Sequence, residues 1–255
     1  MYLFHLEDSF TSDSPVPVTI SSDELWLKAF KHIKGDKSTF ISWSKNLQVA
    51  LAKYYHAPLA GEPASLYITD SVYLWNHERH EKDVIYLDIG KFNSYGAAKG
   101  FFSSKGITEE FPSTYSPIED GEVLTNTLKL PGLRRYRFGY EVFFLIMIAI
   151  LFKDEDVSKV LNAAEDVIST RLAAHDQDLV KLNMTRVTVN DWTVAYKLVS
   201  IFKETDAHLY TLADLKRMPI HSETLPMGKY RIEILDKLIS DVEYQICRAQ
   251  ARTFI

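Results

Sequence analysis

The chain of 255 residues is 46% hydrophobic and 25% charged, a balance that is ordinary for a globular protein with a substantial buried core. Its formal net charge of −5 argues against nucleic acid as the main partner, since duplex-binding proteins generally carry a basic face. The single cysteine, Cys247, excludes an internal disulfide, and its helical setting predicts a small buried residue.

The first residues favour an intracellular protein. They contain no basic segment followed by a long apolar one, so no signal peptide is expected. Residue 2 is tyrosine, whereas N-myristoylation requires glycine at that position. No apolar segment reaches the roughly 20 residues that span a bilayer. We therefore expect a cytoplasmic or otherwise intracellular protein without a transmembrane segment.

The first sixty residues read as a mixture of strand and helix. Met1–Leu6 is predicted to be an edge strand. Ser21 begins a capping box, which predicts a helix through about Ile33. Apolar residues at helical spacing predict a second helix over Ser42–Tyr55.

Alternating segments then predict a small sheet. Ser65–Trp75 and Asp83–Ile89 are rich in β-branched and aromatic residues and flank a charged turn, so we expect an antiparallel hairpin. A short helix from Asn93 to Phe102 should follow. Residues 103–121 read as a long acidic loop, and Glu122–Leu130 alternates as a further strand.

An unbroken apolar run, Val142–Phe152, lies near the middle of the chain. Its eleven residues are too few to cross a bilayer, which needs roughly 20. A helix that is apolar on every side must instead be surrounded by protein. The run therefore predicts a central buried element around which the C-terminal half folds.

The segments after this run repeat apolar residues at intervals of three and four, the spacing of amphipathic helices. We expect three such helices, one of them capped by Asn190 or Asp191 and the last one docked at the C-terminus. The predicted core comprises Phe143, Leu145, Ile146, Ile148, Leu151, Leu161, Ile168, Val199, Leu238 and Val242.

These elements predict an α+β fold, with a small antiparallel sheet and helices in the N-terminal half. The helical C-terminal half packs around residues 142–152. We expect a single compact domain over residues 1–255, with a soft internal boundary near 131 that separates a mixed lobe, 1–131, from a mainly helical lobe, 132–255.

Asp70, Asp88 and Lys91 form the first candidate site. Two carboxylates on adjacent strands can hold Mg²⁺ or Mn²⁺, and a lysine can steady the attacking hydroxide, as in a metal-dependent nuclease or phosphodiesterase. The setting is loosely like the PD-(D/E)xK nuclease core. That core separates acid and lysine by two residues, whereas the separation here is three and requires a bulge at Gly90.

A second candidate groups His77, His80, Glu81 and Asp83, which are residue types that bind zinc. Their spacing does not match HExxH, and they fall in a predicted hairpin turn, where a solvated turn is the simpler reading. We therefore expect no metal or cofactor outside the nuclease alternative.

The third candidate is the strip Arg134, Arg135, Tyr136, Arg137 and Phe138, just before the apolar run. Arginines among aromatic residues suit an acidic protein surface, because guanidinium groups pair with carboxylates through two hydrogen bonds. They also suit nucleic acid, through stacking and phosphate contacts. The third reading is internal pairing with the acidic segment Glu109–Asp120.

The sequence contains no phosphate-binding glycine loop, nucleophile elbow or kinase signature, and it resembles no family that we recognise. The leading hypothesis is a non-catalytic protein-interaction or structural protein, of a regulatory, viral structural or host-interaction type. A protein partner is expected, and an oligomer is compatible with the sequence. The alternatives are the metal-dependent nuclease and nucleic-acid binding through the strip Arg134–Phe138.

Overall fold

The computed structural model describes residues 1–7, 22–33, 40–56, 63–72, 85–88, 95–107, 122–126, 128, 130, 132–205, 207–217 and 226–252. These residues form an α+β fold, as the sequence predicts. The chain divides into two compact units. The first comprises Met1–Ala50 and Tyr67–Arg135, and the second comprises Leu51–Leu66 and Tyr136–Ile255.

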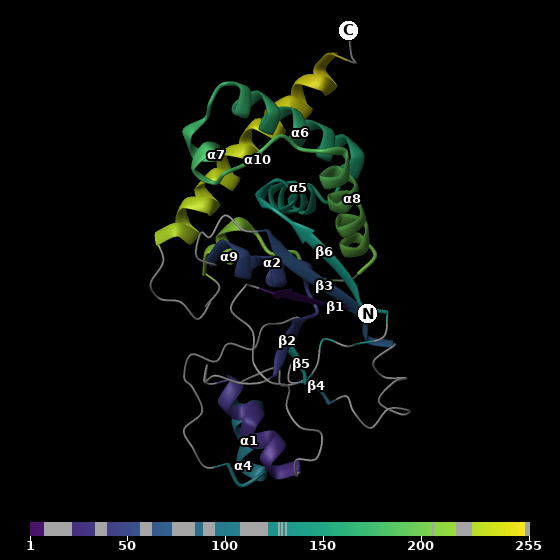
Figure 1. Ribbon diagram of the computed structural model, residues 1–255, viewed down its shortest axis with the longest axis vertical. Helices are drawn as coiled ribbons and strands as arrows, with labels where there is room; N and C mark the ends of the chain where they lie inside the picture. Colours follow the sequence, from purple (N-terminus) through teal and green to yellow (C-terminus); the bar gives the residue numbers. More distant parts are fainter. Residues whose placement is uncertain are drawn as a thin grey trace. The chain divides into compact units, whose positions relative to one another are not determined.

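The described strands form one sheet of six, in the order β4-β5-β2-β1-β3-β6 (Figure 1). The pairs β1–β2, β2–β5 and β4–β5 are antiparallel. The strands are β1 (Tyr2–Glu7), β2 (Ile41–Ser44), β3 (Ala64–Asp70), β4 (Tyr86–Asp88), β5 (Glu122–Thr125) and β6 (Arg134–Phe138). The division into units falls within β3 and β6.

Two predictions about strand pairing are wrong. β1 is an interior strand between β2 and β3, although the sequence predicts an edge strand. Its residues Leu3–Leu6 are buried without interruption, as expected for a strand covered on both faces. The hairpin of β3 and β4 is also wrong, because β5, β2 and β1 lie between them. β4 pairs instead with β5, with Leu87 opposite Leu124.

The second predicted helix begins five residues later than expected. Ile41–Ser44 is strand β2, and helix α2 spans Leu47–His56. Asn46 marks the change, since its side-chain oxygen accepts a hydrogen bond from the Gln48 N–H at 2.8 Å. A side chain of this type satisfies a backbone donor that the first turn of a helix leaves open, and it therefore sets where α2 starts.

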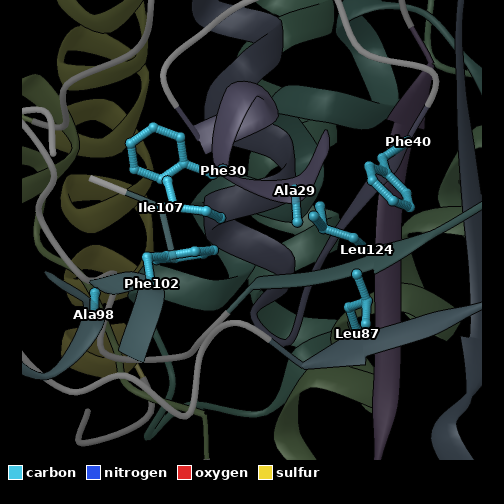
Figure 2. Close-up of a cluster of buried hydrophobic side chains, with 8 residues drawn as sticks. All are labelled: Ala29, Phe30, Phe40, Leu87, Ala98, Phe102, Ile107 and Leu124. Carbon is cyan, nitrogen blue, oxygen red and sulfur yellow. The ribbon is translucent and has the colours of Figure 1, made fainter. Parts of the chain in front are cut away.

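Helices α1 (Ser22–Ile33) and α4 (Tyr95–Ser104) contribute to a hydrophobic cluster with β4 and β5 (Figure 2). The rings of Phe30 and Phe102 meet edge to face, with centroids 5.3 Å apart. The residue before α1 that the sequence assigns as its cap, Ser21, lies outside the described residues. The buried members of the cluster are Ala29, Phe30, Phe40, Leu87, Ala98, Phe102, Ile107 and Leu124.

A second cluster in the same unit contains Leu3, Trp43, Tyr67, Val123 and Leu130. Val123 and Trp43 are directly opposite each other in the β2–β5 ladder. Because directly paired residues point to the same side of a sheet, this cluster marks one face. Leu124, the neighbour of Val123, belongs to the cluster with α1 and α4 on the opposite face.

The second unit is built around helix α5 (Tyr140–Leu151), which packs against α6, α8 and α10 (Figure 1). The other helices are α6 (Val157–Ala173), α7 (Gln177–Lys181), α8 (Val189–Lys203), α9 (Leu212–Arg217) and α10 (Pro226–Arg252). Val142–Ile150 is buried throughout, which confirms that the apolar run is a central buried helix. Among the described residues, no helix is long and apolar enough to cross a membrane.

Nine of the ten predicted core residues are buried, and Leu151 is the exception. It is half-buried because α5 ends there, with Phe152 as the C-cap.

The predicted N-cap of α8, Asn190 or Asp191, is wrong. Thr188 is the N-cap, and Asp191 completes a capping box with it. Cys247 is exposed, contrary to prediction, because it lies about 100° around α10 from the buried Ile246.

Candidate interaction surface on strand β6

The strip Arg134–Phe138 forms strand β6, which is the last strand in the order of the described sheet. Its aromatic residues favour an extended backbone, and Gly139 ends it by serving as the N-cap of α5. All three arginines are exposed, Tyr136 is half-buried, and the side chain of Phe138 lies outside the described set. The strand therefore presents three cationic side chains to solvent.

Alternation along the strand divides these arginines between two faces. Arg135 and Arg137 lie on one face, and Arg134 lies on the other together with Tyr136. Two residues on the same face of a strand are about 6.6–6.8 Å apart along its axis. The pair Arg135 and Arg137 therefore presents two positive charges at the repeat distance of an extended chain.

Arg135 contacts strand β3 through an aromatic ring. Its guanidinium carbon lies 5.5 Å from the centroid of the Tyr67 ring, within the range of a cation–π interaction. The Tyr67 hydroxyl donates a hydrogen bond of 2.7 Å to Glu7 of β1. Burial, then the hydrogen bond to Glu7, raises the pKa of Tyr67 above its ordinary value, and the charge of Arg135 opposes this rise. The ring below Arg135 is thus neutral and fixed in place.

The structure places Asp70 and Asp88 in different surroundings. The Asp70 carboxylate accepts hydrogen bonds from the Met1 ammonium at 3.1 Å and from the Val72 N–H at 3.0 Å. Burial acts to raise the pKa of Asp70, but these hydrogen bonds outweigh it and lower the pKa overall. Asp88 instead pairs with Lys45, whose ammonium lies 2.9 and 3.1 Å from its two oxygens.

The two carboxylates do not converge. Asp70 and Asp88 lie on β3 and β4, which are four steps apart in the strand order, or roughly 19 Å at the usual strand spacing of ~4.8 Å. Asp88 shares the face of Val123, its direct partner, whereas Asp70 is three residues from Tyr67 and points to the opposite face. This geometry does not favour a shared metal ion, and Lys91 lies outside the described residues.

The remaining sequence candidates also fall outside the described residues. These are the proposed zinc ligands His77, His80, Glu81 and Asp83, and the acidic segment Glu109–Asp120. Within the part of the chain that the structure describes, no group of three or more metal-binding side chains gathers. Internal pairing of the arginine strip with the acidic segment therefore stays a prediction.

A polar cluster in the second unit was not anticipated from the sequence. Arg171 of α6 donates from Nε and Nη2 to one oxygen of Asp241 in α10, and from Nη1 to Asp176. Asp178 accepts hydrogen bonds from Tyr230 and Lys237 of α10. Apart from the local pair Arg171 and Asp176, the partners are 52 to 70 positions apart in the chain, so no local pattern could have predicted these contacts to α10. The cluster fastens α6 and α7 to α10.

Comparison with models of protein families, with curated proteins and with solved structures finds no match to this chain.

Proposed function

We propose that this chain is a non-catalytic protein-interaction protein that binds an acidic partner through β6. The observation that carries the proposal is the exposure of Arg134, Arg135 and Arg137 on β6, one of the two outer strands of the described sheet. Arginine is enriched at the sites that dominate binding energies between proteins. Its planar guanidinium can donate two parallel hydrogen bonds to one carboxylate, which makes it more selective for acidic side chains than lysine is.

The charge of the strip favours an acidic protein over the other candidate partners. A second copy of the chain adding at β6 would place arginines near arginines, and like charges facing each other across strands are unfavourable. Nucleic acid would meet a local cationic strip, but the chain as a whole carries a net charge of −5. An acidic protein segment has the complementary charge without requiring a broad basic face.

The test compares the wild type with the triple variant Arg134→Gln, Arg135→Gln and Arg137→Gln. A matched control, Lys153→Gln, Arg186→Gln and Lys197→Gln, removes the same charge from exposed residues elsewhere. The probe is a fluorescent poly-glutamate peptide, with binding measured by anisotropy at two salt concentrations. We expect the strip variant to lose binding and the control variant to retain it. Circular dichroism should show both variants folded.

Two outcomes would overturn the proposal. Equal loss of binding in both triple variants would mean that only the total charge matters. Preferential binding of a single-stranded oligonucleotide through the strip, with a log–log salt slope of about −0.7 per phosphate contact, would support the nucleic-acid alternative instead.

A further inference from the structure

We infer that the partner segment joins the sheet as an added strand beside β6, with acidic residues at alternate positions opposite Arg135 and Arg137. This inference rests on the proposed function and specifies the partner's conformation and sequence pattern. Its starting point is the place of β6, beyond which the structure describes no further strand. An outermost strand has one side on which backbone N–H and C=O groups can pair with another extended chain.

The arginine spacing selects an extended partner over a helical one. Arg135 and Arg137 share a face and repeat every two residues, about 6.6–6.8 Å along the strand. A partner strand has the same repeat, so carboxylates at its positions i and i+2 face the two guanidinium groups together. On a helix, side chains that share a face are three or four residues apart, with a rise of about 1.5 Å per residue. An acidic residue at i+2 would then point away.

The two faces of β6 are unequal, which gives the partner a preferred orientation of its side chains. Arg135 lies over the Tyr67 ring at 5.5 Å, and the Tyr67 hydroxyl is held by Glu7 at 2.7 Å. A guanidinium that already rests on a fixed ring loses less conformational freedom when it pairs with a carboxylate. We therefore expect Arg135 to contribute more to binding than Arg134, which lies on the opposite face.

The positive charge of β6 also disfavours a second copy of the chain as the partner. Antiparallel pairing of β6 with the β6 of a second copy would bring three arginines of each strand together. That repulsion makes β6 a poor site for self-association and leaves it open to an acidic strand.

The experiment uses the full chain and three synthetic peptides with the same side chains and the same net charge. The first alternates glutamate with threonine and valine, the second gathers the same glutamates at one end, and the third repeats the first with N-methyl groups on alternate backbone nitrogens. We expect the alternating peptide to bind about tenfold more tightly than the block peptide. One additional charge-assisted hydrogen bond is enough to give an increase in affinity of that size. N-methylation should abolish binding, because it blocks pairing between main chains.

Variants of the protein complete the test. Arg135→Gln should weaken binding of the alternating peptide more than Arg134→Gln does, and Arg135→Lys should recover only part of the loss. If all three peptides bind equally and the triple strip variant still abolishes binding, the added strand is wrong while the proposed function stands. If poly-glutamate and all three peptides fail to bind the wild type, both are wrong.

Discussion

Asp178 accepts a hydrogen bond from the Tyr230 hydroxyl at 2.9 Å and another from the Lys237 ammonium at 2.7 Å, so that one carboxylate joins α7 to two turns of α10. The hydrogen bond from Lys237, and then that from Tyr230, lowers the pKa of Asp178 below its ordinary value. Burial and the hydrogen bond to Asp178 raise the pKa of Tyr230 from 10.0 to about 12. The contact should therefore weaken at both ends of the pH range. In acid it is lost when Asp178 becomes protonated, and in alkali it is lost when Tyr230 becomes deprotonated.

Tyr230→Phe tests the alkaline limit. Because the pKa of Tyr230 is raised on folding, its stabilising effect is complete below pH 10 and is lost as the pH rises through about 12. Removing the hydroxyl should cost about 0.5–1.5 kcal/mol at pH 8, as measured by urea unfolding. This difference between wild type and variant should shrink steadily above pH 10. A difference that stays constant up to pH 11 would show that the pKa of Tyr230 is not raised.

Asp178→Asn tests the acid limit of the same contact. The pKa of Asp178 is lowered on folding from its ordinary value of 3.8, so its contribution is complete above that value and is lost as the pH falls below it. The variant should therefore be less stable than the wild type at pH 7. The two should converge in stability toward pH 2. If the wild type keeps its advantage there, neighbouring charges rather than Asp178 determine the acid response.

Gly139→Ala should disturb the start of α5. A Cβ at this position would lie 2.6 Å from the Glu141 Oε2 atom, closer than real contacts allow. Glu141 cannot move freely, because its Oε1 atom accepts hydrogen bonds from the Thr185 N–H at 2.5 Å and from the Thr185 hydroxyl at 2.9 Å. We expect the alanine to displace the carboxylate and lower the unfolding free energy by about 1 kcal/mol.

Two controls separate this clash from a general effect of replacing glycine. In a Glu141→Ala background the clash is gone, so Gly139→Ala should cost much less and the double-mutant cycle should be strongly non-additive. Gly100→Ala, within α4, meets nothing within 4 Å and should stabilise by about 0.5–1 kcal/mol. Additive effects at positions 139 and 141 would contradict the proposed contact.

Local patterns predicted the elements of this fold better than their partners. The apolar run Val142–Phe152 and the stripes of α6 and α10 were found because burial imposes a helical repeat over many residues. Pairing of β3 with β4 was predicted from nearness along the chain, and it is wrong because β4 pairs with β5, more than thirty residues later. An alternating segment reveals a strand but not its neighbour.

The sequence also predicted the residues of the candidate site better than their surroundings in the fold. The density of arginine singled out the strip before α5, but nothing in its five residues revealed that it is an outer strand of the described sheet or that Tyr67 lies beneath Arg135. Asp70 and Asp88 were grouped only through the supposed hairpin. Once the strand order separates them, the grouping loses its basis. The Lys45 partner of Asp88 had no sequence signal at all.

Ile146→Asp tests the central position of α5. Ile146 is fully buried, and an unpaired carboxylate in that surrounding should cost several kcal/mol, enough to lower the melting temperature sharply. Val189→Asp is the matched control, because Val189 is 85% exposed at the start of α8. The control should change stability by less than about 0.5 kcal/mol. An unchanged melting temperature in Ile146→Asp would refute the buried position of the helix.

Thr125→Val tests the contact that joins β2 to β5 inside the first unit. The Trp43 indole nitrogen donates a hydrogen bond of 2.8 Å to the Thr125 hydroxyl, and both side chains are fully buried. Valine has nearly the shape of threonine but no hydroxyl, so the indole N–H would remain in the interior without its acceptor. A buried donor left in this way costs about 1–3 kcal/mol, which chemical unfolding can measure.

Thr125→Ser keeps the hydroxyl and loses only a methyl group, so its cost should be smaller and should persist when Trp43 is replaced by Phe. The cost of Thr125→Val should largely disappear in that Trp43→Phe background, because no indole N–H remains to be satisfied. Equal costs of Thr125→Val with Trp43 and with Phe at this position would show that the hydrogen bond does not stabilise the sheet.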